Sequence, residues 1–261
     1  MNLGLKGRTA IVTGASVGIG LAIAEGLAAE GTNLILAARG GERMAAECSR
    51  IAGTFGVTAT PVAADVATEA GVAAIVDAAK AAGVDILVNN AGTGSGETVL
   101  DAPDAKWDQY WDLHVKAAVR LARGVHPLMK ARGGGVILHN ASICATQPLW
   151  YEPVYNVSKA ALLMFSKTLS YEFIKDNIRV NTVNAGLILT PDWIKTAKQL
   201  TAASGGDYEA YLQKVADDFA PIRRFGTPEE AANLFVFLAS ARASYCVGST
   251  YYVDGGMLRT I

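Results

Sequence analysis

Residues 8–24 read RTAIVTGASVGIGLAIA: a run of β-branched and small residues passes into an apolar segment with helical spacing, and Gly14, Gly18 and Gly20 lie at the junction. Glycines there allow a tight turn and let backbone N–H groups approach a pyrophosphate, whose charge the N-terminus of the helix stabilises. The turn is completed by Ser16, Val17 and Ile19. Spacing alone also fits an ordinary strand-to-helix turn, but this turn follows the first strand, which favours a dinucleotide-binding site.

The same alternation of strand and helix continues along most of the chain. Strands are predicted near residues 8–14, 33–39, 60–66, 85–92, 134–142, 178–186 and 249–256, with longer helical segments between them. Strands that alternate with helices in this way are parallel, and the helices cover both faces of the sheet. The sequence therefore predicts an α/β fold: a doubly wound, Rossmann-like parallel sheet in three layers (α/β/α), forming a single domain over residues 1–261.

One segment, at about residues 187–224, interrupts this alternation. It is long, partly helical and broken by Gly205 and Gly206. Because long excursions from a compact scaffold commonly carry function, we expect this segment to lie on the substrate side.

Composition narrows the class of ligand. The chain has a formal net charge of −1 and only 18% charged residues, which argues against nucleic-acid binding and against a basic membrane-binding patch. Cys48, Cys144 and Cys246 are scattered without metal-ligand spacing, so neither a disulfide framework nor a metal site is predicted. We find no secretory signal and no uninterrupted apolar run long enough for a membrane helix, so we expect a cytoplasmic protein with a small-molecule ligand.

The second predicted strand ends where a dinucleotide site discriminates between NAD and NADP. The sequence there reads LILAARGGER, with the neutral Ala38 followed by Arg39. A carboxylate at Ala38 would bind the 2′-hydroxyl of the adenine ribose and repel a 2′-phosphate, whereas the planar guanidinium of Arg39 suits a phosphate. NADP(H) is therefore favoured and NAD(H) remains possible; for Arg39 the alternative is a solvated loop arginine.

Tyr155 and Lys159 stand one helical turn apart in the stretch EPVYNVSKAAL. This spacing places both side chains on one face of a helix, and taken alone it is more simply explained as an exposed amphipathic pair. A tyrosine with a pKa of about 10 becomes a base near pH 7 only if its phenolate is stabilised by roughly 4 kcal/mol. One cation at about 4 Å supplies this at an effective dielectric of about 20, so we expect Lys159 to lower the pKa of Tyr155.

Four motifs in order resemble the short-chain dehydrogenase/reductase family, in its compact branch and similar to 3-oxoacyl reductases. They are the glycine turn, NNAG at 89–92, Ser142 near the end of a later strand, and YNVSK at 155–159. The resemblance covers nearly the whole chain. It implies an oxidoreductase that transfers hydride between NADP(H) and a ketone or secondary alcohol, with Tyr155 as general acid/base assisted by Ser142 and Lys159. It also implies a homotetramer or a homodimer.

The resemblance further implies which residues contact the cofactor. Asp65 and Val66 would hold the adenine ring, although an aspartate at a strand end can instead cap the next helix. The remaining contacts would come from Asn90, Ala91, Gly92, Tyr155, Lys159, Gly186, Ile188 and Thr190.

Two positions depart from the family pattern. Ala185 precedes Gly186 where a proline is usual, which is a mild change. His114 stands where the family usually has an asparagine that is associated with a helix kink and a proton relay. His114 could serve such a relay through its backbone carbonyl, shuttle protons with its imidazole near neutral pH, or simply pack within its helix.

Residues 143–154, ICATQPLWYEPV, join Ser142 to Tyr155 and must therefore border the reacting group. The candidates for the wall of the substrate pocket are Cys144, Gln147, Trp150, Tyr151 and Glu152, with Trp193 of the excursion closing over them. The tryptophans suggest a partly apolar or ring-shaped substrate, and Glu152 suggests a hydroxyl or amine. Core packing for the tryptophans and a solvated helix start for Glu152 explain these residues equally well.

Two other functions fit the same motifs. An NAD-dependent sugar, polyol or steroid dehydrogenase would differ only in its pocket. A non-catalytic NADP-sensing protein would typically have lost the tyrosine or the lysine, and this chain keeps both.

Overall fold

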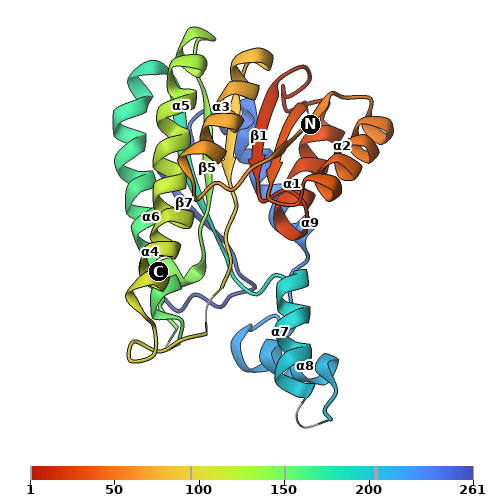
Figure 1. The fold of residues 1–261 in the computed structure, drawn as a ribbon, viewed down its shortest axis with the longest axis vertical. Coiled ribbons are helices and arrows are strands. Elements are labelled where there is room, and N and C mark those ends of the chain that lie inside the picture. Colours follow the sequence, from red (N-terminus) through yellow and green to blue (C-terminus); the bar gives the residue numbers. More distant parts are fainter. Residues whose placement is uncertain (1, 95, 150, 203–204, 261) are drawn as a thin grey trace.

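In the computed structural model, which describes residues 2–94, 96–149, 151–202 and 205–260, a seven-stranded parallel sheet is covered by helices on both faces (Figure 1). The strands are β1 (Thr9–Thr13), β2 (Asn33–Ala38), β3 (Ala59–Ala63), β4 (Ile86–Asn89), β5 (Gly135–Asn140), β6 (Ile178–Ala185) and β7 (Thr250–Val253). Their order in the sheet is β3-β2-β1-β4-β5-β6-β7. The predicted doubly wound, Rossmann-like sheet is confirmed.

Successive residues of the central strands face opposite layers of helices, because side chains alternate along a strand. In β1, Ala10 and Val12 pack against one layer and Ile11 against the other. The first layer contains α1 (Gly18–Ala29), α2 (Gly41–Phe55) and α9 (Pro228–Ala239), and the second contains α3 (Glu69–Ala82), α5 (Ala117–Ala131) and α6 (Pro153–Phe173). Burial of both faces explains why the strands are nearly continuous apolar runs.

The direction of strand order reverses between β1 and β4. From β1, the sheet extends through β2 and β3 on one side and through β4 to β7 on the other. In open parallel sheets the carboxyl ends of the strands at such a reversal border a crevice. Thr13 ends β1 and Asn89 ends β4, so the glycine turn and the NNAG motif meet at this crevice.

The long helix predicted around His114 is not uniform. α4 (Asp104–Tyr110) passes into a π-helical segment (Trp111–Lys116) before α5 begins. His114 is buried within this segment. Single π-helical turns inside α-helices are uncommon and occur frequently at functional sites.

The predicted excursion at about residues 187–224 consists mainly of α7 (Pro191–Ala202) and α8 (Tyr208–Phe219), which stand beyond the main body in Figure 1. Short 3-10 turns occupy Ile143–Ala145, Ile174–Asp176 and Ala241–Ala243. No helix in the described residues combines the length and the apolar character needed to cross a membrane.

Candidate active site

The turn between β1 and α1 requires glycine for two different reasons. Gly14 and Gly18 have positive φ angles of 64° and 57°, which residues with a side chain rarely adopt. Gly20 has no space for a side chain, because a Cβ there would lie 2.4 Å from Asn90 Nδ2. The N-cap of α1 is Val17, whose side chain makes no capping hydrogen bond, so the first N–H groups of the helix are available to an anion.

The start of the NNAG motif braces this turn. The side-chain amide of Asn90 donates to Thr13 O at 2.9 Å and to Gly14 O at 3.3 Å. Thr13 Oγ1 accepts from the backbone N–H groups of Asn90 and Ala91, at 3.0 and 3.1 Å. The structure thus brings the turn and the motif, which lie far apart in the sequence, to one edge of the sheet.

Two residues from the segment after β6 lie near the same turn. A Cβ on Gly18 would lie 3.3 Å from Thr190 Cγ2, so Thr190 directly borders the turn. Ile188 is buried and packs in an apolar cluster together with Ile19. Both sequence-predicted positions are therefore close to the start of α1.

Asp65 forms local contacts just before α3, but the residue that caps this helix is Thr68. Asp65 Oδ1 accepts from the backbone N–H of Ala67 at 3.0 Å, and the Asp65 carbonyl accepts from Thr68, the N-cap of α3. Val66 is buried between these residues and the core. Asp65 thus braces the start of the next helix.

Two arginines flank the start of α2. Arg39 follows β2, and Arg43, which was not predicted from the sequence, lies in the first turn of the helix. Both side chains are exposed, and neither forms a hydrogen bond or ion pair within the described part of the chain. The spacing of four residues across the helix start was the available signal for Arg43. Two unpaired guanidinium groups at a helix start suit a phosphate.

Ser142, Tyr155 and Lys159 come together from two elements. Ser142 follows β5, and Tyr155 and Lys159 lie one turn apart on α6. Lys159 is buried; its Nζ donates to Asn140 O at 2.9 Å and lies 5.5 Å from the centre of the Tyr155 ring. A buried hydroxyl, a buried ammonium group and a partly buried phenol therefore share one site.

Burial dominates the pKa values in this site. It lowers the pKa of Lys159 to about 8. It raises the pKa of Tyr155 above the usual value, and a hydrogen bond with Ser142 offsets this only in part. The net direction is upward because placing a phenolate in an apolar surrounding is costly, and the expectation that Lys159 lowers the pKa of Tyr155 stays a prediction. At neutral pH Tyr155 is a phenol that can donate a proton.

His114 is a neutral, buried imidazole. Burial, and secondly the charge of Lys159, holds the pKa of His114 well below its usual value. Its Nε2 lies 3.4 Å from the backbone N–H of Thr93, so Nε2 accepts and Nδ1 carries the proton. Nδ1 then donates to Ser158 Oγ at 2.8 Å, and the Ser158 hydroxyl donates to Tyr155 O at 3.0 Å. His114 therefore supports the backbone of α6 at Tyr155.

The surroundings of His114 leave little room for another arrangement. A Cβ on Gly92 would lie 3.0 Å from His114 Nε2 and 3.4 Å from Lys159 Nζ. The His114 and Tyr155 rings meet edge-on, with centroids 5.6 Å apart. Of the three roles left open by the sequence, proton shuttling by a change of imidazole charge near neutral pH is disfavoured. The contacts add a fourth role, in which His114 supports the position of Tyr155.

Comparisons with known proteins identify the family. A family model described as enoyl-(acyl carrier protein) reductase matches residues 14–258. L-sorbose reductase from Gluconobacter frateurii, solved in complex with NADPH and L-sorbose, is 63% identical, with 100% of both chains covered and a TM-score of 0.99. The chain belongs to the short-chain dehydrogenase/reductase family. The resemblance based on the four motifs is thereby confirmed.

More distant members of the family match over nearly the full length. Dehydrogenase/reductase SDR family member 4 of Bos taurus is 35% identical, over 97% of this chain and 88% of its own length. 3beta-hydroxysteroid dehydrogenase 1 of Eggerthella lenta is 34% identical, over 97% of this chain and 94% of its own length. The family thus includes members whose names point to different substrates.

In this member of the short-chain dehydrogenase/reductase family, Glu152 occupies an unusual position close to Tyr155. It is the N-cap of α6 and has a left-handed backbone (φ 63°, ψ 45°), which costs on the order of 1 kcal/mol or more for a residue with a side chain. Burial, and secondly the charge of Glu97, raises the pKa of Glu152 to about 7. Its carboxyl group has no hydrogen-bond or ion-pair partner among the residues described. It is therefore free to bind a substrate group.

The other predicted wall residues differ in their surroundings. Cys144 is buried, and burial raises the pKa of its thiol, which argues against a nucleophilic role. Gln147 Nε2 donates to Met257 O and its Oε1 accepts from the backbone N–H of Arg259, both after β7, and contact of Gln147 with a substrate stays a prediction. Burial raises the pKa of Tyr151 to about 12. Trp150 lies outside the described residues.

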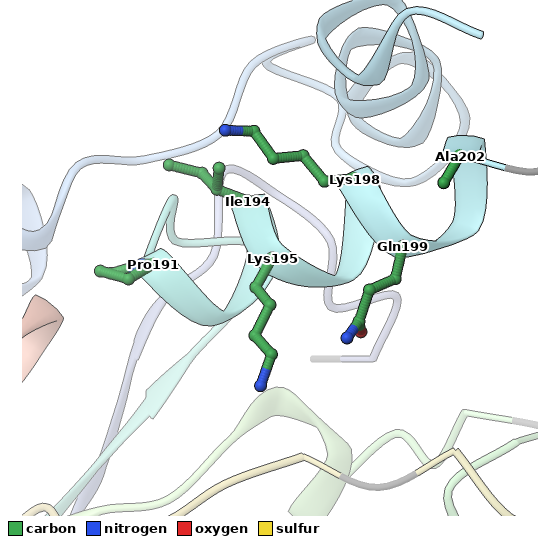
Figure 2. A pocket seen from close by; sticks show the side chains of 6 residues that line it. All are labelled: Pro191, Ile194, Lys195, Lys198, Gln199 and Ala202. Atoms are coloured by element: carbon green, nitrogen blue, oxygen red, sulfur yellow. The ribbon is translucent and has the colours of Figure 1, made fainter. Parts of the chain in front are cut away.

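The excursion packs against the same apolar cluster as Tyr155, and its place on the substrate side stays a prediction. Trp193 of α7 packs against the apolar cluster that also receives Tyr155, and its ring meets that of Phe225 edge-on at 5.2 Å. Along α7 lies an apolar hollow of about 500 Å³, lined by Pro191, Ile194, Lys195, Lys198, Gln199 and Ala202. Figure 2 shows Lys195 and Gln199 extending to one side of α7 and Lys198 to the other.

The state of Glu152 leads to a prediction about stability and pH. Because the fold raises its pKa from about 4.5 to about 7, it favours the neutral acid. The stability that the neutral acid contributes to the folded state is fully present below about pH 4.5 and is lost as the pH rises through about 7. The glutamine of Glu152→Gln cannot ionise. The free energy of unfolding of this variant, relative to that of the wild type, should therefore rise by on the order of 2 kcal/mol when the pH is raised from 5 to 8.

Chemical denaturation of both proteins at the two pH values measures this difference. Glu30→Gln, at an exposed position at the end of α1, is the matched control and should show no such dependence on pH. An equal effect of Glu152→Gln at both pH values would contradict the argument.

Proposed function

We propose that the chain is an NADP(H)-dependent oxidoreductase that interconverts a polyhydroxy ketone and the corresponding secondary alcohol. The observation that carries this proposal is the grouping of the buried Ser142 and Lys159 with the partly buried Tyr155, at the end of β5 and the start of α6. The likeness to a reductase solved with NADPH and L-sorbose supports both the cofactor and the class of substrate.

The residues around the glycine turn fit NADP(H). A pyrophosphate would meet the uncapped N-terminus of α1, where the glycines leave space for its approach. Arg39 and Arg43 would hold the 2′-phosphate of the adenine ribose. When bound, the nicotinamide supplies hydride for reduction or accepts it in the reverse direction.

The protein's own groups handle the proton. In the reduction, Tyr155 donates its phenolic proton to the substrate oxygen, and Ser142 donates a hydrogen bond to the same oxygen. The raised pKa of Tyr155 ensures that this proton is present at neutral pH. The ammonium of Lys159, 5.5 Å from the ring centre, then stabilises the phenolate that remains. In the oxidation the same groups act in reverse.

Glu152 favours a substrate with hydroxyl groups. Its carboxyl lies close enough to Tyr155 to raise the pKa of the phenol electrostatically. The carboxyl has no hydrogen-bond or ion-pair partner in the described part of the chain. A hydroxyl beside the reacting carbonyl would donate to it and offset the cost of its burial. A ketose meets this requirement, whereas a simple aliphatic ketone leaves the carboxyl unpaired.

A second candidate substrate is a steroid. The observation that favours it is the apolar cluster beside Tyr155, which includes Ile143, Leu187 and Met257. A hydroxysteroid dehydrogenase is also among the relatives of the chain. A sensing role without turnover has no comparable support, because Ser142, Tyr155 and Lys159 are all present.

The surface of α6 supports the predicted homotetramer or homodimer. Val157, Met164 and Tyr171 are each at least half exposed. They recur at every second helical turn and therefore form one apolar stripe along the helix. Such a stripe suits contact with a second copy of the chain.

The general-acid role is tested with Tyr155→Phe. Turnover of a ketose should fall by at least about 100-fold, because the proton donor is lost, while the Kd for NADPH stays within about threefold. Loss of NADPH absorbance is followed with a panel of ketoses and steroid ketones, and cofactor affinity by fluorescence. Tyr245→Phe, at a fully exposed position, is the control and should leave turnover unchanged.

Two results would count against this proposal. Loss of NADPH binding in Tyr155→Phe would show that the tyrosine serves the cofactor site instead. A wild-type protein that binds NADPH but reduces no ketone and oxidises no alcohol across the panel would favour the sensing role.

The choice of cofactor is tested with Arg39→Asp. The carboxylate should repel the 2′-phosphate and accept the 2′-hydroxyl, so the ratio of kcat/KM for NADPH to that for NADH should fall by about 10-fold or more. Lys175→Asp, which makes the same change of charge near the amino end of β6, controls for overall charge. An unchanged ratio in Arg39→Asp would show that Arg39 does not bind the 2′-phosphate.

The role of His114 is tested with His114→Leu. Loss of the bonds to Ser158 and Thr93 should lower kcat by about 10-fold or more, because the backbone at Tyr155 loses its support. The pH profile between 6 and 8 should keep its shape, since the imidazole is neutral there. His114→Asn, which can replace one of the bonds, should recover part of the rate. If the wild-type rate changes with pH in this range and the change is absent in His114→Leu, the imidazole titrates during turnover.

A further inference from the structure

The side chain of Gln147 forms two hydrogen bonds with residues 254–260, the post-β7 segment. Its Nε2 donates to Met257 O at 3.3 Å, and its Oε1 accepts from the backbone N–H of Arg259 at 2.9 Å. One amide thus pairs with the donor and the acceptor of a passing backbone, two residues apart, as a neighbouring strand would.

The post-β7 segment is folded back on itself by Asp254. The carboxylate of Asp254 accepts from the backbone N–H groups of Gly256 at 3.0 Å and Leu258 at 2.8 Å. Gly255 and Gly256 have φ angles of 61° and 85°, which permit this sharp turn. The turn directs Met257 back toward the body of the protein.

Met257 is packed into the substrate side of the active site. It is 8% exposed and belongs to the apolar cluster of Ile143, Cys144, Leu187 and Ala220, against which the rings of Tyr155 and Trp193 also pack. A Cβ on Gly186 would lie 3.0 Å from Met257 Sδ, so the segment also rests directly on the start of the excursion. The post-β7 segment therefore reaches the same cluster as the proposed proton donor.

The loop after Ser142 is tied to the same edge of the sheet by a second contact. Thr146 Oγ1 lies 3.0 Å from the hydroxyl of Tyr252 on β7, and it accepts from Asn184 Nδ2 at 3.2 Å. Thr146 and Gln147 together fasten this loop to β7 and to the post-β7 segment. Displacement of the post-β7 segment would remove the Gln147 contacts, while Thr146 would still hold the loop after Ser142 to β6 and β7.

We propose that the post-β7 segment is a wall of the substrate pocket, that Gln147 is the positioning residue that holds it there, and that Met257 limits the size of the substrate. This proposal rests on the proposed function for the identity of the reaction. In this role Gln147 acts on the substrate pocket through the post-β7 segment.

The first test uses Gln147→Leu, which keeps a similar volume and removes both hydrogen bonds. Hydrogen exchange at the backbone amides of residues 258 and 259 should become at least about 10-fold faster. The KM for the best ketose should rise by about 10-fold or more while kcat stays within about threefold and the Kd for NADPH is unchanged. Gln213→Leu is the matched control, because Gln213 is exposed on α8 and also donates to a backbone carbonyl, that of Arg223.

The second test uses Met257→Ala, which should enlarge the pocket without breaking the two hydrogen bonds. The ratio of kcat/KM for a bulkier ketone to that for the ketose should rise by about fivefold or more. Should Gln147→Leu not fold, Gln147→Glu is measured instead, since it keeps the acceptor for Arg259 and loses the donor to Met257.

The outcomes separate this proposal from the proposed function. Unchanged exchange in the Gln147 variant, or faster exchange with unchanged KM and unchanged substrate range in both variants, overturns the proposal. A wild-type protein without turnover on any ketone or alcohol defeats the proposed function, and the role of Gln147 is then decided by hydrogen exchange alone.

Discussion

The geometry of the site depends on a short chain of hydrogen bonds across the carboxyl end of the sheet. The Asn90 amide donates to Gly14 O, the Asn140 amide donates to Asn90 Oδ1 at 2.8 Å, and Lys159 Nζ donates to Asn140 O. The glycine turn and Lys159 are thus joined through two asparagines on neighbouring strands. Because low local dielectric strengthens such bonds and makes an unpaired partner costly, the chain fixes the cofactor end of the site against the proton-donating end.

Sheet register is what brings these asparagines together. Asn89 of β4 pairs with His139 of β5, which places Asn90 beside Asn140. A slip of one residue would turn every side chain of the strand to the opposite face. The buried, two-sided packing of the central strands prevents such a slip, since each face presents its own apolar set to its own layer of helices. Packing in the apolar core therefore fixes the positions of the two asparagines at the carboxyl end of the sheet.

The fold and family could be predicted from the sequence because their signals are local. The glycine spacing, the alternation of strand and helix, and the four-residue step from Tyr155 to Lys159 each lie within one element or one turn. Arg43 carried a signal of the same kind at four residues from Arg39, which could have been recognised. The assignments of the individual site residues remain predictions, since the fold constrains their positions and not their chemical roles.

The features that sequence reasoning missed depend on contacts between distant segments. The pKa of Tyr155 is set by burial, which arises only when α6 packs against the loop after β5 and against the excursion. Gln147 was expected to face the substrate because of its place between Ser142 and Tyr155, yet its partners lie after β7, about a hundred residues further along the chain. The π-helical segment around His114 is likewise invisible in a pattern of apolar residues.

The cluster around Met257 also has a consequence for redesign. Ile143, Leu187, Ala220 and Met257 come from four separate stretches of the chain and are packed as in a protein interior. At such density an added methylene displaces its neighbours and a missing one leaves a void. Engineering this pocket for a new substrate is therefore a problem in repacking a small core, in which replacements at several of these positions have to be chosen together.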